Sequence, residues 1–105
     1  MYLKRQTFLV LGLSRSGKAA AKFLLERGAN VFIYDDVDGK RIAETERELE
    51  ALGGKRLNKE SLSKTPELCD GLVLSPGIPI DHSLAVAFKR SGKAVLGETE
   101  LAARF

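Results

Sequence analysis

The chain has 105 residues, a length that supports one domain and not two. Seventeen Lys and Arg residues against 14 Asp and Glu residues give a net charge of +3 at pH 7, which is only mildly basic. Because 44% of the residues are hydrophobic and 30% are charged, the composition excludes a disordered or fibrous chain and predicts a domain with a real core.

Apolar runs and soft metal ligands are both scarce. The longest apolar run, residues 8–13, is far shorter than the roughly 20 residues that span a bilayer, so we expect no membrane-spanning helix. A single cysteine, Cys69, excludes an intramolecular disulfide, and a single histidine, His82, leaves too few ligands for an ordinary zinc site. We therefore expect a cytoplasmic protein without a metal site, in which Cys69 is a small buried hydrophobe.

The chain opens with a strand, a glycine turn and a helix. Residues 6–11 are predicted to form a strand, because residues 8–11 are continuously apolar, as is typical of a parallel strand buried on both faces. A tight turn over residues 12–17 follows, and the periodicity then predicts a helix over residues 18–27. We expect Ser16 to be the N-cap of this helix and Gly28 to end it.

A second strand and helix repeat this pattern. Residues 31–34 read as another buried strand, and residues 40–52 as a helix with Ile42, Leu49 and Leu52 facing the core. The remaining predicted elements, in chain order, are a short strand over 55–57, a helical turn over 61–64, a strand over 71–74, a helix capped by Asp81 and ended by Gly92, a strand over 94–96 and a helix over 98–105.

Strands that alternate with helices at this spacing predict an α/β fold. We expect a Rossmann-like, doubly wound, mainly parallel sheet of about five strands, with right-handed crossovers and helices on both faces. Ligands of such sheets sit at the carboxyl ends of the strands, so three segments should converge there: residues 12–17, the pair Asp35-Asp36, and residues 75–79.

The first of these segments, Gly12-Leu-Ser-Arg-Ser-Gly17, nearly fits two phosphate-binding motifs. In the dinucleotide pattern G-x-G-x-x-G, Ser14 replaces the second glycine; in G-x-x-x-x-G-K-[ST], Ala19 stands where a hydroxyl should bind magnesium. A helix N-terminus with Arg15 beside it nevertheless suits an anion. The loop therefore indicates a diphosphate ligand without a nicotinamide or a metal, unless its glycines serve only the geometry of the turn.

Four motifs in this order resemble the N-terminal domain of the Mur ligases. They are the glycine loop, Asp35-Asp36, Ser75-Pro-Gly-Ile-Pro79 and Gly97-Glu-Thr-Glu-Leu101. They follow in the same order and at similar spacing, so the resemblance extends over essentially the whole chain. Among the Mur ligases, the chain most resembles those that add D-glutamate to UDP-N-acetylmuramoyl-L-alanine in peptidoglycan synthesis. The last two motifs are the most specific part of the resemblance.

The resemblance implies a substrate-binding domain that does not catalyse by itself. Residues 1–105 would bind the uridine diphosphate part of the substrate, while a central domain of the same polypeptide, absent here, would bind ATP and Mg²⁺, and a C-terminal domain, also absent, would help to admit the amino acid. No catalytic residue, metal ligand or resident cofactor is implied for residues 1–105. The implied substrate-binding residues are Gly12, Ser14, Arg15, Ser16, Gly17, Asp35, Asp36, Ser75, Pro76 and Gly77.

Two other functions compete with this interpretation. Asp35 after the second strand would also suit an NAD(H)-binding regulatory or dehydrogenase domain, although Ser14 counts against it. A protein-interaction domain on an α/β scaffold is the second rival. Nucleic-acid binding is disfavoured because the paired basic residues, such as Lys4-Arg5 and Lys55-Arg56, are scattered among acids and not gathered on one element.

Overall fold

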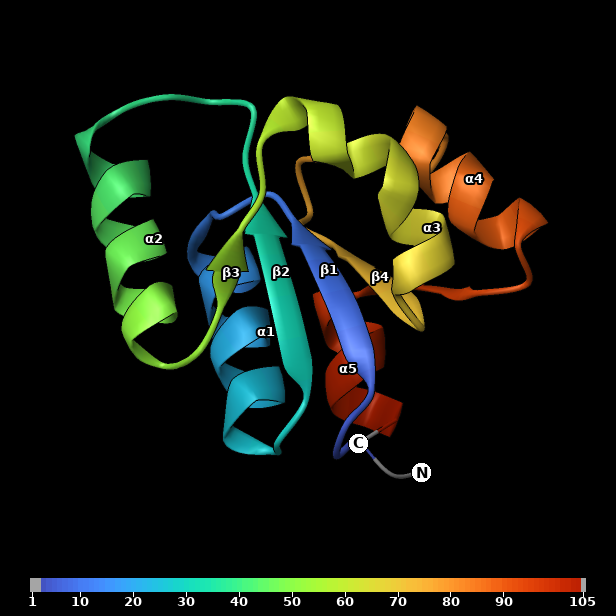
Figure 1. Cartoon of the computed structure of the whole chain (residues 1–105), viewed down its shortest axis with the longest axis horizontal. Helices are drawn as coiled ribbons and strands as arrows, with labels where there is room; N and C mark the ends of the chain where they lie inside the picture. Colours follow the sequence, from blue (N-terminus) through green and yellow to red (C-terminus); the bar gives the residue numbers. More distant parts are fainter. Residues whose placement is uncertain (1–2, 105) are drawn as a thin grey trace.

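A computed structural model describes residues 3–104 and shows a parallel five-stranded sheet with helices on both faces (Figure 1). The strands are β1 (Thr7–Leu11), β2 (Asn30–Tyr34), β3 (Lys55–Arg56), β4 (Gly71–Leu74) and β5 (Ala94–Gly97). The helices are α1 (Arg15–Glu26), α2 (Lys40–Ala51), the 3-10 helix η1 (Lys59–Lys64), α3 (Thr65–Leu68), α4 (Ser83–Arg90) and α5 (Glu98–Arg104). Within residues 3–104, no helix is long and apolar enough to cross a membrane.

Successive side chains of β1 enter two different cores. Phe8 and Val10 are buried with residues of α1, α2 and α5 on one face of the sheet, and Leu9 and Leu11 are buried with residues of α4 on the other. A strand covered on both faces needs apolar residues at every position, which explains its unbroken run. The strand order β3-β2-β1-β4-β5, with every pair parallel, confirms the predicted doubly wound fold.

The strand order places a topological switch point between β1 and β4. The chain builds from β1 toward β2 and β3, then returns to add β4 and β5 on the other side of β1. In the register, Leu11 pairs with Tyr34 on one side and with Leu74 on the other, so the three strands end at the same level. The ladder continues one step further: Gly12 N–H donates to the Tyr34 carbonyl at 2.8 Å and Ser75 N–H to the Leu11 carbonyl at 3.0 Å. The predicted convergence of the three segments is confirmed.

Helix α1 begins three residues earlier than predicted. Its N-cap is Ser14, not Ser16: Ser14 has extended backbone, with φ −65° and ψ 178°, and its carbonyl accepts the N–H of Lys18 at 2.8 Å. The Ser14 hydroxyl also accepts the Gly17 N–H at 3.4 Å. Two serines two residues apart are equivalent as cap candidates in the sequence, and the contact of the Ser14 hydroxyl with the hydroxyl of Ser75 favours Ser14. The glycine turn is correspondingly shorter.

Two smaller expectations at helix ends are wrong, and a third is confirmed except at one residue that lies outside the described residues. The N-cap of α4 is His82 and not Asp81, because the His82 Nδ1 accepts the Leu84 N–H at 3.1 Å. Leu52 does not face the core: it follows the last residue of α2 and is 51% exposed. Predicted helix 98–105 is confirmed as far as Arg104, and Phe105 lies outside the described residues.

Cys69 is buried, as expected from the sequence. Its side chain is 1% exposed and belongs to the core beneath α4. Burial, followed by the neighbouring Asp70 carboxylate, raises the pKa of the thiol to about 11. The side chain is therefore a packing group and a poor nucleophile.

Candidate functional site

The turn between β1 and α1 is so closely packed that two of its positions accept only glycine. Gly12 has φ +92°, and a Cβ on it would lie 2.6 Å from the Cβ of Ser75. Gly17 has no positive φ, but a Cβ on it would lie 1.9 Å from the carbonyl oxygen of Gly12. Both separations are far inside van der Waals contact. The geometry of the turn thus requires these glycines, so their presence alone does not establish a ligand.

The N-terminus of α1 supplies the feature that does suit an anion. Because the Lys18 N–H makes the first intrahelical bond, the amides of Arg15 and Ser16 precede it and have no partner within the helix. The first turn of α1 contains no acidic residue that would neutralise the positive end of the helix dipole. Arg15 is exposed beside this end and adds a full positive charge. This end of the helix can therefore hold a phosphate group.

A hydroxyl pair joins the glycine turn to the segment after β4. The Oγ atoms of Ser14 and Ser75 are 2.5 Å apart, and Ser75 is only 4% exposed. Ser14 stands where the dinucleotide motif has its second glycine, so a side chain occupies the place at which a bare backbone would approach a pyrophosphate. Pro76 and Gly77 follow at the surface, and a Cβ on Gly77 would meet nothing within 4 Å. These two residues therefore form an open rim beside the turn.

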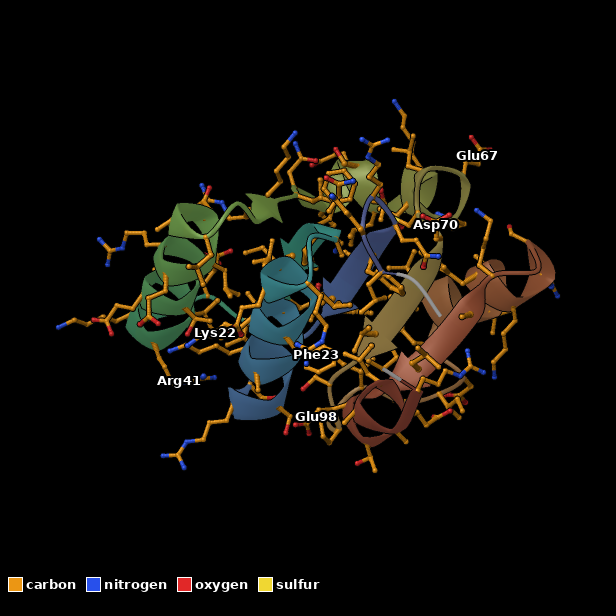
Figure 2. The ribbon with its side chains drawn as sticks, turned by 90° about the horizontal axis from the view of Figure 1, so that it is seen from below. Lys22, Phe23, Arg41, Glu67, Asp70 and Glu98 are labelled. Carbon is orange, nitrogen blue, oxygen red and sulfur yellow. The ribbon has the colours of Figure 1, made fainter. Side chains whose placement is uncertain are left out.

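Asp35 is bound to the glycine turn through the main chain. One carboxylate oxygen accepts the Leu13 N–H at 2.6 Å, and the other accepts the Val37 N–H at 2.8 Å. The carbonyl of the same Leu13 accepts a hydrogen bond from Nη1 of Arg41 at 3.2 Å. Arg41 lies in the first turn of α2, on the side that faces α1 (Figure 2). The Leu13 N–H is thus bound by the carboxylate of Asp35, and the Leu13 carbonyl is bound by the guanidinium of Arg41.

Asp36 lies at a pocket of about 370 Å³ on the α4 side of the sheet. The pocket lies between the end of β2, η1 and the start of α4, and its polar lining includes Tyr34, Asp36, Lys59 and His82. The Tyr34 hydroxyl donates to Asp36 Oδ1 at 2.9 Å. Burial of the ring, this hydrogen bond and nearby carboxylates raise the pKa of Tyr34. The pocket has the donors and acceptors that a polar heterocycle or a sugar would need.

Lys18 does not serve the glycine turn. Its Nζ lies 2.6 Å from Glu48 Oε2, so the side chain is directed at α2. In the triphosphate-binding motif the equivalent lysine reaches the phosphates. The contact is consistent with the rejection of that motif, and it also ties α1 to α2.

The structure brings most of the predicted site residues to one edge of the sheet. Within the turn, Gly12, Ser14 and Gly17 contact one another or the neighbouring segments, and Asp35 and Ser75 contact the turn directly. The other predicted residues lie around these contacts: Arg15, Ser16, Asp36, Pro76 and Gly77. That these residues bind uridine diphosphate stays a prediction.

Sequence reasoning missed three polar residues of this region: Lys59, His82 and Arg41. For Arg41 the sequence offered a topological signal, because the first turn of α2 follows β2 and must start near the edge of the sheet where β2 ends.

Comparisons with known proteins agree with these motifs. Residues 6–97 match the family model of the Mur ligase MurD-like N-terminal domain. The chain is 36% identical over 104 residues to the UDP-N-acetylmuramoylalanine–D-glutamate ligase of Prochlorococcus marinus (strain MIT 9515), an alignment that covers 94% of the chain and 22% of the relative. It is 37% identical over 108 residues to the ligase of the same name from Acidobacterium capsulatum, covering 100% of the chain and 23% of the relative. The chain thus spans about a fifth of the length of these relatives.

Solved structures share the fold at low sequence identity. D-mandelate dehydrogenase from Rhodotorula graminis matches with a TM-score of 0.64 and 24% identity, covering 92% of the chain and 28% of that structure. Shikimate dehydrogenase from Aquifex aeolicus matches with a TM-score of 0.59 and 19% identity, covering 96% of the chain and 45% of that structure. These likenesses establish a Rossmann-like fold and carry no conclusion about the ligand.

Proposed function

The chain belongs to the family of MurD-like N-terminal domains of Mur ligases, and we propose that it binds the uridine diphosphate part of UDP-N-acetylmuramoyl-L-alanine. The observation that carries this proposal is the convergence of three segments at the β1/β4 switch point around the acid-free N-terminus of α1. A nucleoside diphosphate needs such an anion site beside a pocket for its base and sugar.

We assign the diphosphate to the start of α1. The main-chain N–H groups of Ser14, Arg15 and Ser16 would donate to the phosphate oxygens, and the Arg15 guanidinium would add charge. Gly12 and Gly17 shape the turn that exposes those groups, since side chains at either position would clash with neighbouring atoms.

We assign the uridine to the region after β2. Asp36 faces the pocket of about 370 Å³ and would accept a hydrogen bond from the uracil N3–H or a ribose hydroxyl. Asp35 would add an acceptor at the same edge, although both of its oxygens already accept main-chain N–H groups. Ser75, Pro76 and Gly77 would form the remaining wall of the cleft.

In the complete polypeptide we propose that this domain presents the substrate to an ATP-dependent ligase. Transfer of the γ-phosphoryl group of ATP to the terminal carboxylate of the substrate would give an acyl phosphate and ADP. The amine of D-glutamate would then attack the acyl carbon, forming the amide bond and releasing phosphate. ATP and Mg²⁺ would bind in a central domain, so the 105-residue chain would bind without catalysing. Because the reaction draws on the cellular ATP pool, we place it in the cytoplasm.

An NAD(H)-binding domain remains the competing function, because Asp35 ends β2 as in dinucleotide-binding domains. Two observations weigh against it: the Ser14 hydroxyl stands at the pyrophosphate approach, and the Asp35 carboxylate is engaged by main-chain N–H groups.

Titration calorimetry on the 105-residue chain separates the two functions. We expect saturable binding of UDP-N-acetylmuramoyl-L-alanine and of UDP, and no binding of NADH at matched concentrations. Saturable binding of NADH without binding of either uridine nucleotide would overturn the proposal.

A further inference from the structure

We propose that Arg41 is a positioning residue of the diphosphate site, acting through the main chain of Leu13; this inference rests on the proposed function. Its basis is a contact chain that we call the Leu13 clamp: the Asp35 carboxylate on the Leu13 N–H at 2.6 Å, and the Arg41 guanidinium on the Leu13 carbonyl at 3.2 Å. Leu13 itself is 0% exposed, so the packing of its side chain in the core also restrains the position of this residue.

The clamp fixes the orientation of the next amide. The Leu13 carbonyl and the Ser14 N–H belong to one planar peptide group, and the described residues contain no cis peptide bond. In a trans peptide the N–H points opposite to the carbonyl. Because Arg41 draws the carbonyl toward α2, the Ser14 N–H must point away from α2. This amide opens the run of N–H groups that we assign to the diphosphate, and a hydrogen bond to its carbonyl also polarises it as a donor.

The clamp also balances charge at the turn. The Asp35 carboxylate lies within hydrogen-bond distance of the turn and would repel a diphosphate. Arg41 places a permanent positive charge on the other side of Leu13. The guanidinium has five N–H donors and uses one on the Leu13 carbonyl. This hydrogen bond to a neutral carbonyl holds the guanidinium in place and leaves its positive charge unneutralised.

Arg41 is held by a helix that is anchored at several points. The residue after it, Ile42, is 5% exposed in the core, and Leu49 is fully buried there. The contact between Lys18 and Glu48 joins α2 to the helix that starts at the turn. A side chain on such an element can hold a fixed geometry better than one on a loop. The side chain of the neighbouring Lys40 makes no hydrogen bond or ion pair within residues 3–104, which makes Lys40 a matched control.

The test compares Arg41→Gln, Arg41→Lys and the control Lys40→Gln in the 105-residue chain labelled with ¹⁵N. The probes are UDP and uridine, titrated by NMR up to about 10 mM so that weak binding is measured. Arg41 and Lys40 are both exposed, and thermal melting checks that each variant is folded.

We expect Arg41→Gln to weaken UDP binding about fivefold and to leave uridine binding within about twofold. Because Arg41→Lys keeps the positive charge, it should lose less UDP affinity than Arg41→Gln. In the absence of ligand, the Ser14 amide signal should shift in Arg41→Gln and stay in place in Lys40→Gln. The inference is overturned if Arg41→Gln binds UDP like the unchanged chain, if uridine loses as much affinity as UDP, if lysine recovers nothing, or if the Ser14 amide does not respond. Wild-type chain that binds no UDP would overturn the proposed function as well, which distinguishes the two failures.

Discussion

Replacement of Gly17 by alanine sets two physical effects of opposite sign against each other. Gly17 lies in α1 without a positive φ, and alanine at an ordinary helical position stabilises a protein by about 0.5 to 1 kcal/mol relative to glycine. The new Cβ, however, would lie 1.9 Å from the Gly12 carbonyl oxygen and 2.9 Å from the Gly12 carbonyl carbon. Both atoms belong to the main chain, so no side-chain rotation relieves the contact.

The clash should win over the helix preference. Overpacking costs roughly 1 to 3 kcal/mol, and a contact with rigid backbone belongs at the upper end of that range. We therefore expect Gly17→Ala to lower the free energy of unfolding by about 2 kcal/mol, which shifts the urea midpoint down by roughly 1 M for an ordinary m value. Urea unfolding followed by far-ultraviolet circular dichroism measures the shift.

Gly77→Ala is the matched control for this prediction. A Cβ on Gly77 would meet nothing within 4 Å, so the stability should change by less than about 0.5 kcal/mol. A Gly17→Ala chain that is as stable as the unchanged chain, or more stable, would refute the close packing of the turn.

Three further predictions concern titratable groups. Burial raises the pKa of the Cys69 thiol to about 11, so at pH 8 its reaction with a disulfide reagent should be more than about a hundredfold slower than that of an ordinary thiol. Equal reaction rates in the folded and the unfolded chain would contradict this prediction. The hydrogen bond from Lys18 and its charge lower the pKa of Glu48, so this exposed contact contributes its stability at neutral pH and loses it as the pH falls through the folded pKa. NMR titration should show the low pKa of Glu48, and Lys18→Met should remove most of the shift, because Lys22 makes only a smaller contribution. Burial and the hydrogen bond to Asp36 raise the pKa of Tyr34, so the contribution of this contact to stability is complete below the unfolded pKa and is lost as the pH rises through the folded pKa. Ultraviolet titration of Asp36→Asn should show a lower pKa of the Tyr34 phenol than in the unchanged chain, and an unchanged pKa would exclude the contact.

The sheet could be predicted from sequence because burial on both faces leaves a strong signal. The run Phe8-Leu-Val-Leu11 has to be apolar at every position once helices cover both faces of the sheet, and the strand that it predicts occurs within one residue of its expected start. The level at which three strands end follows from their parallel pairing, so the meeting of Gly12, Asp35 and Ser75 could be expected without knowledge of the register.

The details of the turn could not be predicted, because long-range contacts decide them. Ser14 and Ser16 are equal candidates for the N-cap by residue type, and only the contact of Ser14 with Ser75, 61 positions away, favours the first. Arg41 resembled an ordinary exposed helix residue. Its contact with Leu13 joins residues 28 positions apart, and no local pattern encodes that distance.

The most direct test of the account is a residue-resolved NMR titration of the ¹⁵N-labelled chain with UDP-N-acetylmuramoyl-L-alanine, with NADH at matched concentrations as the control. We expect saturable amide shifts confined to residues 12–17, to Asp35 and Asp36, and to residues 75–77, and no shifts with NADH. Shifts that map to the opposite edge of the sheet, or shifts with NADH alone, would contradict the assignment of a uridine diphosphate site to the carboxyl ends of β1, β2 and β4.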